Sequence, residues 1–452
     1  MDLISSYNKY TLHTEPPEQF HFWTLIHGVG SALGRKVFYQ QGLLEYYVNL
    51  FIILLGPPAT KKSTALGLTK KFLQQMPEDF FFLSNIMTKE KLLDEMSSPA
   101  HRRSFDAIGR RWEFSQATGF CSEISSFIGE NYRADSMGNF LIELWDEKYQ
   151  IEEKTRKHGT VTAKLPFGNF IGGAVPEWFY NKLSTEIISS GLARRFLLVY
   201  AERPARPVPF PDDVDKEITD NIRNHFFRIT QMVGRMTLTE CAKKVHLKYY
   251  DKNYDPAPNL PDYVKSFMGT KAEFSLKLAM IFSAMRDSTR VIDGPILDFS
   301  WRLLSYLEGD FDKIYAKMGT NQLNPMASKV TKYLNAERGT SKAVLLKKVW
   351  RDMDVQSLDM VLDNLVTMKA VEVTDTMNGD GTTYKLTKES CVREPMNFFD
   401  EAKELMKPHS FKSGPVSVGP SFLEFEQQQN QVAQQQNHEA ALLLNAPELE
   451  QQ

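Results

Sequence analysis

Nine consecutive residues carry the strongest chemical signal in the sequence. They run from Gly56 to Thr64 and read Gly-Pro-Pro-Ala-Thr-Lys-Lys-Ser-Thr. A continuous apolar run precedes them and a helical pattern follows them, so they are predicted to form a loop that opens a helix. Backbone N–H groups at a helix N-terminus point outward, and the helix dipole favours negative charge there. The segment is therefore predicted to bind phosphate groups.

The residue types within this loop suggest separate roles. On the spacing of a phosphate-binding loop, Lys62 reaches the β- and γ-phosphates of ATP and the Ser63 hydroxyl binds Mg²⁺. Such a loop usually has glycine just before this lysine, whereas Lys61 stands there, and its side chain restricts the backbone. The alternative is a plain loop with two solvated lysines. The predicted nucleotide contacts are Gly56, Pro57, Pro58, Ala59, Thr60, Lys61, Lys62, Ser63 and Thr64.

Hydrolysis of ATP also needs a carboxylate at the end of a neighbouring strand. There it holds the metal or polarises the attacking water. Glu123 is the best candidate, because it ends the predicted strand segment Thr-Gly-Phe-Cys-Ser-Glu. It is assigned both a catalytic and a metal-binding role. Asp146 and Glu130 are reserves, and for both of them a plain surface carboxylate is the favoured interpretation.

Two adjacent arginines, Arg194 and Arg195, come directly before an apolar run. In oligomeric motors an arginine at this place reaches the γ-phosphate held by the neighbouring subunit. A structural ion pair is the alternative, and composition alone hardly separates the two.

A basic segment lies between two predicted strands. Gly159 and the β-branched residues after it predict a hairpin with basic side chains near its tip. A basic tip can hold the phosphates of a single nucleic-acid strand inside the pore of a ring. A solvated hairpin is the alternative. The predicted nucleic-acid contacts are Lys154, Arg156, Lys157 and His158.

A parallel sheet is expected to position these residues. Strands separated by helix-sized intervals indicate an α/β core. Apolar runs predict strands at 46–55, 80–83, 119–122, 170–175 and 196–200. Helical spacing predicts helices at 17–33, 63–76 and 89–96. The proline-rich segment 203–211 interrupts regular structure and is predicted to be a boundary or an extended strap.

The remaining chain changes character twice. Residues 213–318 are predicted to be helical, and Lys277 lies in an apolar stripe from which its ammonium is expected to reach solvent. Residues 326–386 then predict three helices and a hairpin, the arrangement of a winged helix. Asp359 and Asp363 on its third helix repel phosphates, which favours a protein contact or a structural role over DNA binding. The Gln-rich segment from about residue 414 is expected to be mostly disordered.

Composition limits the class of protein. The chain has 452 residues with 54 Lys and Arg against 56 Asp and Glu, which excludes a histone-like basic protein and a polyacidic mimic. Its 3 cysteines form no CxxC pair, so a disulfide framework or a cysteine zinc site is not expected, and a reducing cytosol fits. Neither a membrane-spanning stretch nor a signal peptide is predicted. A cytoplasmic protein without membrane contact is expected.

The order of these motifs resembles a family of phage and prophage P-loop ATPases that are similar to the helicase half of primase–helicase proteins. The resemblance covers about residues 17–310 and is carried by QFHFW, NLFIILLGPPATKKSTA, SEISSFIGE, NFLIELWDEKY, KTRKHGT, NFIGGAVPEW and SGLARRFLLVYAE. It implies an AAA+ or RecA-type core, ring assembly, and work in DNA replication inside an infected or lysogenic bacterium. It carries Lys62 and Ser63 onto the phosphate loop, Glu123 onto the acidic strand end, and Arg195 onto the arginine before the last strand.

The resemblance has further implications. The segment that holds Lys154 to His158 resembles the DNA-contacting hairpin of superfamily 3 helicases. The family pattern places a polar sensor residue after the Gly-Gly pair, where this chain has Ala174 and Val175. Asn169 could take that role only from the active end of the strand.

The expected protein is a ring-forming ATPase, with a hexamer favoured, that couples hydrolysis at subunit interfaces to movement on single-stranded DNA. It could also contact replication proteins. One alternative is an ATPase that loads or remodels a host helicase or initiates replication. Another is a DNA-binding regulator with a degenerate nucleotide site, as Lys61 would suggest. The expected division is an N-terminal helical segment (1–45), a P-loop ATPase core (46–205), a helical lid domain (206–320), a winged-helix-like domain (321–390) and a mostly disordered tail (391–452).

Overall fold

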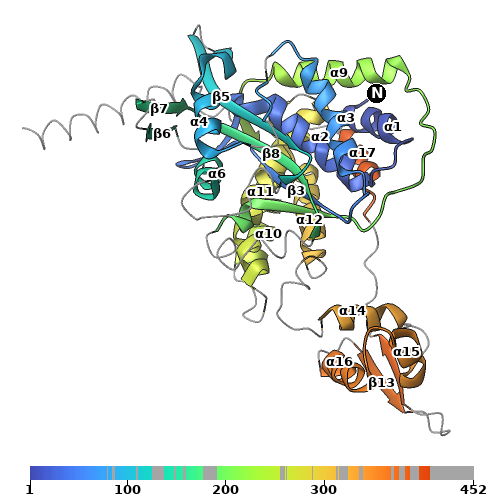
Figure 1. The fold of residues 1–452 in the computed structure, drawn as a ribbon. Coiled ribbons are helices and arrows are strands. Elements are labelled where there is room, and N and C mark those ends of the chain that lie inside the picture. Colours follow the sequence, from blue (N-terminus) through green and yellow to red (C-terminus); the bar gives the residue numbers. More distant parts are fainter. Residues whose placement is uncertain are drawn as a thin grey trace, which may run out of the picture. The chain divides into compact units, whose positions relative to one another are not determined.

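The computed structural model describes residues 1–78, 80–83, 87–107, 110–124, 137–146, 149–155, 159–176, 191–254, 260, 262–287, 289–311, 314, 324–334, 340–367, 371–375, 382–386 and 396–407. These residues fall into two compact units (Figure 1). The first takes its described residues from 1–175, 185–305 and 398–407, and the second from 176 and 306–397. The first unit therefore runs across the predicted boundaries at residues 45 and 205.

A parallel sheet lies at the centre of the first unit, as the apolar runs predicted. In the described part of the chain it has five strands, and β5, β8, β3 and β9 are parallel while β4 runs antiparallel to β5. Both β3 and β8 are buried along their whole length, which explains why their sequences do not alternate with polar residues. The order across the sheet is β4 (Arg102–Ala107), β5 (Arg110–Cys121), β8 (Phe167–Ala174), β3 (Phe51–Leu55) and β9 (Phe196–Tyr200).

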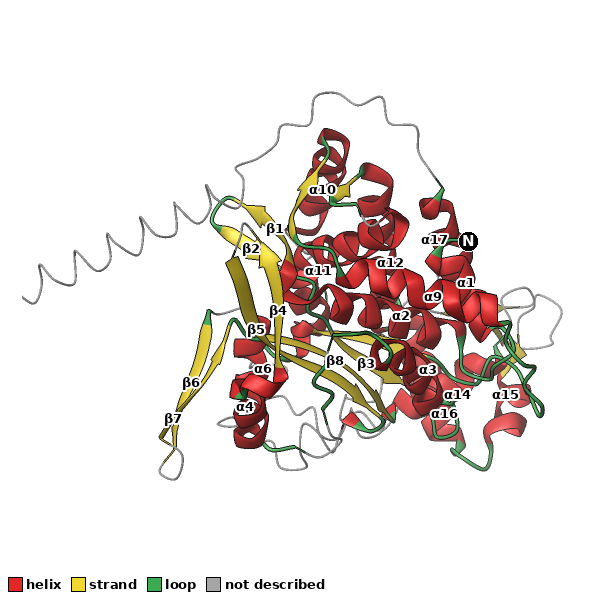
Figure 2. Cartoon of the chain, turned by 90° about the horizontal axis from the view of Figure 1, so that it is seen from above, coloured by secondary structure: helices red, strands yellow, loops and turns green. Residues whose placement is uncertain are grey.

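Helices cover the sheet on both faces. Helix α2 (Glu18–Leu33) packs against α3 (Lys62–Gln74) and touches β8, β3 and β9. Figure 2 shows α4 (Lys89–Ser97) and α6 (Met137–Trp145) on the side of the sheet opposite to α2. Helix α2 also contacts α9 (Lys216–Thr230), α11 (Asp262–Asp287) and α17 (Phe398–Met406), and α1 (Leu3–Thr11) packs on these three helices.

A second sheet of the first unit has no counterpart among the predicted strands. Its order in the described residues is β11 (Val291–Ile292), β10 (Gly234–Leu238), β1 (Val37–Gln41) and β2 (Leu44–Tyr46). Strand β1 is parallel to β10, so it joins the N-terminal part of the chain to the helical region that includes α10 (Glu240–Tyr254) and α12 (Gly294–Glu308). The single strand predicted at 46–55 is wrong at its start, because Tyr46 pairs with β1 and the central strand begins at Phe51.

Most other predicted elements are confirmed with shifted ends. The predicted helices at 17–33, 63–76 and 89–96 correspond to α2, α3 and α4, and the strand at 196–200 is β9. The strand predicted at 80–83 is reduced to a bridge between Phe82 and Thr118. The basic hairpin is formed by the antiparallel strands β6 (Gln150–Thr155) and β7 (Gly159–Lys164).

The described residues of the second unit include helices and a hairpin at the predicted places. The predicted helices correspond to α14 (Asn324–Tyr333), α15 (Lys342–Val349) and α16 (Val355–Thr367). Its described strands form an antiparallel sheet in the order β12 (Thr340–Ser341), β14 (Thr382–Leu386), β13 (Val371–Asp375). Asp359 of α16 forms an ion pair with Lys342, which offsets part of its negative charge. A separate apolar core holds the unit together: Val330, Leu334, Leu345, Val349, Met353, Leu358, Val361, Leu362, Leu365 and Val371.

The prediction that Lys277 reaches solvent is wrong. Its side chain is fully buried on α11. The ammonium lies 2.7 Å from Asn49 Oδ1, 2.9 Å from Glu273 Oε1 and 4.0 Å from the centre of the Trp145 ring. Buried charges require such partners, and here the interior supplies them.

None of the described helices has the length and apolar character needed to cross a membrane.

Candidate phosphate-binding site

The loop between β3 and α3 adopts a backbone conformation that is unusual for its sequence. Ala59 and Lys61 have positive φ angles of 66° and 63°. Lys61 is also the N-terminal cap residue of α3. The left-handed region favours glycine, so a side chain at Lys61 costs roughly 1 kcal/mol. The missing glycine noted in the sequence is therefore a real departure, and the fold nevertheless keeps the glycine-like conformation.

Close packing at Gly56 holds the loop against the end of β9. A Cβ atom at Gly56 would lie 2.7 Å from the carbonyl oxygen of Ala201 and 2.9 Å from Thr60 Oγ1. Thr60 is buried, and its hydroxyl donates a hydrogen bond to the Pro57 carbonyl at 2.8 Å. The loop is thus braced from within and from the neighbouring strand.

The ammonium group of Lys62 lies inside this loop. It donates hydrogen bonds to the carbonyl oxygens of Gly56 at 2.7 Å and Pro57 at 3.1 Å, and to Thr60 Oγ1 at 3.1 Å. Burial lowers the pKa of Lys62, and the negative charge of Glu123 acts against this shift. Three oxygen acceptors therefore hold a cation at the place where the spacing of the motif puts the phosphates.

The acidic candidate lies at the same edge of the sheet. Glu123 is exposed and follows the carboxyl end of β5, which is separated from β3 by β8. Gly173 of β8 brings the two parts together: a Cβ atom there would lie 2.8 Å from the Ser122 carbonyl oxygen and 3.3 Å from side-chain carbons of Lys62. The structure therefore places Lys62 and the end of β5 next to one another, with β8 between the two strands.

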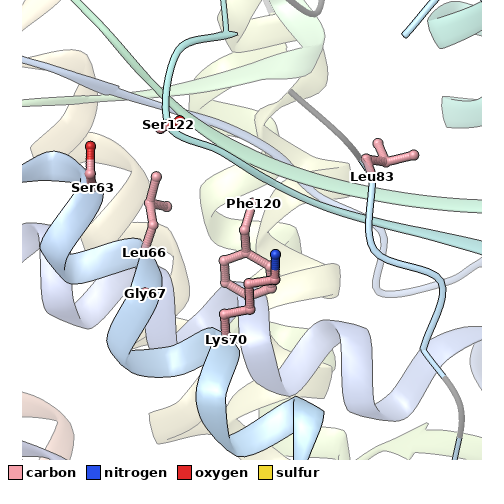
Figure 3. Close-up of a pocket in the computed structure, with 7 residues that line it drawn as sticks. All are labelled: Ser63, Leu66, Gly67, Lys70, Leu83, Phe120 and Ser122. Carbon is pink, nitrogen blue, oxygen red and sulfur yellow. The ribbon is translucent and has the colours of Figure 1, made fainter. Parts of the chain in front are cut away.

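A pocket of about 450 Å³ adjoins the first turn of α3. Figure 3 shows Ser63 on α3 and Ser122 after β5 on facing sides of this pocket. Ser63 and Thr64 are both exposed. The rest of the lining is Leu66, Gly67, Lys70, Leu83 and Phe120.

The donor groups at this end of α3 fit Mg²⁺ bound together with a nucleotide. Among the described residues, no group of three or more His, Cys, Asp or Glu side chains is placed to hold a metal by itself. Mg²⁺ in phosphate sites usually takes one or two protein oxygens and completes its shell with water and phosphate oxygens. The Ser63 hydroxyl and the Glu123 carboxylate are oxygen ligands of the required kind.

Asn169 lies at the wrong end of its strand for a role at this site. It is the third residue of β8, whereas the phosphate loop follows the carboxyl end of β3. Its amide nitrogen donates to the His27 carbonyl at 2.9 Å and to Ser31 Oγ at 2.7 Å, and its Oδ1 accepts from the Leu50 N–H at 2.8 Å. Asn169 therefore lies at the end of β8 away from the loop, and the buried Ala174 is the last residue of β8 beside it.

The two arginines differ in their surroundings. Arg195 is buried, and its guanidinium donates to Asp146 Oδ1 at 2.6 Å and to the Gly191 carbonyl at 2.9 Å. Arg194 is exposed. Arg195 and the reserve carboxylate Asp146 therefore form the structural ion pair that the sequence had left as an alternative. Both arginines precede the amino end of β9, whereas the phosphate loop follows the carboxyl end of the parallel strand β3. They therefore lie at opposite ends of the strands.

Several predicted residues cannot be placed. Glu130, Arg156, Lys157 and His158 lie outside the described residues. The backbone of Lys154 is part of β6, where it pairs with Thr160 of β7.

Sequence reasoning missed two residues at the site. Gly173 had a signal in its Gly-Gly pair, although the sequence could not show what packs against it. Glu15 had none, yet its carboxylate lies 2.5 Å from the Lys61 ammonium. In comparisons with known proteins, neither a protein-family model nor a curated protein matches the chain.

Proposed function

We propose that the chain is a P-loop ATPase whose phosphate loop is Gly56 to Thr64. The observation that carries the proposal is the Lys62 ammonium held by three loop oxygens at the carboxyl edge of a parallel sheet. Glu123 supports the proposal, because it follows β5, which is separated from β3 only by β8. In nucleotide hydrolases these are the positions of the phosphate-binding lysine and the catalytic acid.

Each residue has a defined part in the proposed reaction. Lys62 exchanges its bonds to loop carbonyls for bonds to phosphate oxygens, and the N–H groups at the start of α3 bind the same phosphates. Ser63 and Glu123 would hold the Mg²⁺, which neutralises phosphate charge when bound. Glu123 orients a water molecule for in-line attack on the γ-phosphate and accepts its proton.

The proposed assembly is a ring, with a hexamer favoured, that moves on single-stranded DNA during replication. The arginines before β9 are far from the phosphate loop of their own chain, so either could act only on a neighbour's nucleotide. The sequence pointed to Arg195, but its pairing with Asp146 makes the exposed Arg194 the better candidate for that contact. The β6–β7 hairpin would carry the DNA contacts, and the second unit would serve as a winged helix.

Nucleotide binding and phosphate release test the core of this proposal. Lys62→Ala should abolish binding of a fluorescent ATP analogue. Glu123→Gln should retain binding and lose hydrolysis. Lys71→Ala is the matched control, because Lys71 is an exposed lysine on the same helix. Unchanged nucleotide affinity in Lys62→Ala, with Lys71→Ala also unchanged, would remove the assignment.

One observation favours a second candidate, an ATPase that loads or remodels a host helicase. The buried Ala174 stands where a polar sensor is expected, and Asn169 is committed elsewhere. Slow hydrolysis would suit a loader. A strand-displacement assay with the purified chain separates the two: displacement without other proteins supports the helicase, and displacement only with a host helicase supports the loader. An absence of nucleotide binding would instead leave the regulator with a degenerate site.

A further inference from the structure

Lys61 is held by a carboxylate that comes from a distant part of the chain. Its ammonium lies 2.5 Å from Glu15 Oε2, and both side chains are partly exposed, at 41% and 31%. The hydrogen bond from Lys61 is the main reason why the pKa of Glu15 lies below its usual value. An anion of the protein itself therefore contacts a cation of the phosphate loop.

The proline-rich strap 203–211 fixes the segment that carries Glu15. The Ala205 N–H donates to the Glu15 carbonyl at 2.9 Å, and the Arg206 guanidinium donates to the Leu12 carbonyl at 2.7 Å. The Glu15 carboxylate also accepts a hydrogen bond from the Val208 backbone. Glu15 is thus held in place by its backbone and its carboxylate.

Stability does not account for a lysine at this position. An exposed ion pair stabilises a fold only weakly, which at best offsets the backbone cost of a left-handed lysine. Glycine would adopt the same backbone without that cost. A cation next to the first turn of α3 has a clearer use, since the N–H groups there are the expected phosphate donors.

We propose that Lys61 is a second phosphate-binding cation, and that Glu15 competes with the nucleotide for it. A triphosphate carries several negative charges and also interacts with the N–H groups and dipole of α3, so it draws Lys61 away from a single carboxylate. Nucleotide binding then frees Glu15 from the loop and couples the 12–17 segment to the nucleotide state. This inference rests on the proposed ATP site and adds a regulator to it.

Calorimetric titration of the full chain with ATP tests the competition. Glu15→Gln should tighten ATP binding by about threefold to tenfold, because a weak surface pair no longer has to break. Lys61→Gly should weaken binding by a similar factor while the thermal midpoint is not lowered. In the double variant the affinity should equal that of Lys61→Gly alone. Asp212→Asn is the control, since it removes an exposed carboxylate that directly follows the strap.

Three outcomes of these titrations would contradict the competition between Glu15 and the nucleotide. Unchanged affinity in Glu15→Gln, or equal tightening in the presence and absence of Lys61, overturns the competition. Tightening by Asp212→Asn as large as that by Glu15→Gln also overturns it, because net charge alone would then be the cause. Failure of the ATP site itself is distinct: the unmodified chain and Lys62→Ala would then show the same affinity.

Discussion

Gly173 is the residue at which three parts of the candidate site come together. The Ser122 carbonyl oxygen, just after β5, and the Cβ and Cδ atoms of Lys62 lie within 3.3 Å of the position that a Cβ atom on Gly173 of β8 would take. The Ser122 carbonyl belongs to the backbone and cannot turn aside as a flexible side chain can. The absence of a side chain at Gly173 thus allows the lysine and the acidic strand end to approach.

Gly173→Ala should therefore push Lys62 and the end of β5 apart, because the added Cβ atom would clash with both. We expect a loss of about 1–3 kcal/mol in the free energy of unfolding from overpacking, and nucleotide affinity at least about tenfold lower. Urea unfolding and ATP titration measure the two effects. Gly269→Ala is the control, because nothing lies within 4 Å of a Cβ atom at Gly269. Normal affinity and stability in Gly173→Ala would show that the contact is not restrictive.

At this scale the sequence predicts local relations well and distant contacts poorly. Lys62 and Ser63 follow from their spacing in one strand–loop–helix segment. The pairing of Lys61 with Glu15 joins residues of separate segments, and no periodicity signals it. The bond from Arg195 to Asp146 is of the same kind, which explains why composition could not separate a structural arginine from a catalytic one.

Among the elements, α2 is notable for two buried histidines. Burial lowers the pKa of both His21 and His27 to about 3. They stay neutral in the folded chain, whereas the unfolded chain takes up their protons below the ordinary histidine pKa of about 6.5. The unfolded state therefore binds more protons between pH 6.5 and 3, and stability falls as the pH falls through this window.

Urea unfolding at pH 7.5, 6.5, 5.5 and 4.5 tests the role of α2. Well below pH 6.5, each buried histidine should contribute up to about 1.4 kcal/mol of lost stability per pH unit. His27→Gln should reduce the slope by that histidine's share, whatever its effect at neutral pH. His13→Gln, at an exposed histidine, is the control. A slope that His27→Gln leaves unchanged would contradict the burial argument.

Strands that are recognisable from their own residues were predicted, and strands that depend on a partner far along the chain were missed. Strands β3 and β9 are short apolar runs and were visible in the sequence. Strand β1 pairs with β10, which lies far along the chain, and neither has a continuous apolar run. The start of β5, with the charged residues Arg110, Arg111 and Glu113, has no apolar run that would predict a strand, because this part pairs with β4 alone.

For the whole molecule, the distance between the loop and the arginines governs how copies could cooperate. The phosphate loop follows the carboxyl end of β3, and Arg194 precedes the amino end of the parallel strand β9. The five residues of β9 are extended, so the two ends of the strands are about 16 Å apart. A complete site would then need two copies of the chain.

Mixing two inactive variants tests this arrangement. Lys62→Ala and Arg194→Ala should each lose phosphate release alone, and a mixture should regain part of it, since some interfaces join two unaltered halves. Arg195→Ala tests the other arginine and should mainly lower stability, because it leaves Asp146 without its partner. No regain on mixing, or full activity of Arg194→Ala, would rule out Arg194 as a shared residue.

The contact between α1 and α17 has a consequence for how the protein is made. Phe399 of α17 stacks on Tyr7 of α1, and Phe398 packs on Phe22 of α2, although the whole second unit lies between them in the chain. At about 5–20 residues per second, a ribosome needs some tens of seconds to pass from the first of these helices to the last. During that interval the apolar residues of α1 and α2 that α17 will cover stay exposed, so the nascent chain should depend on chaperones until α17 emerges.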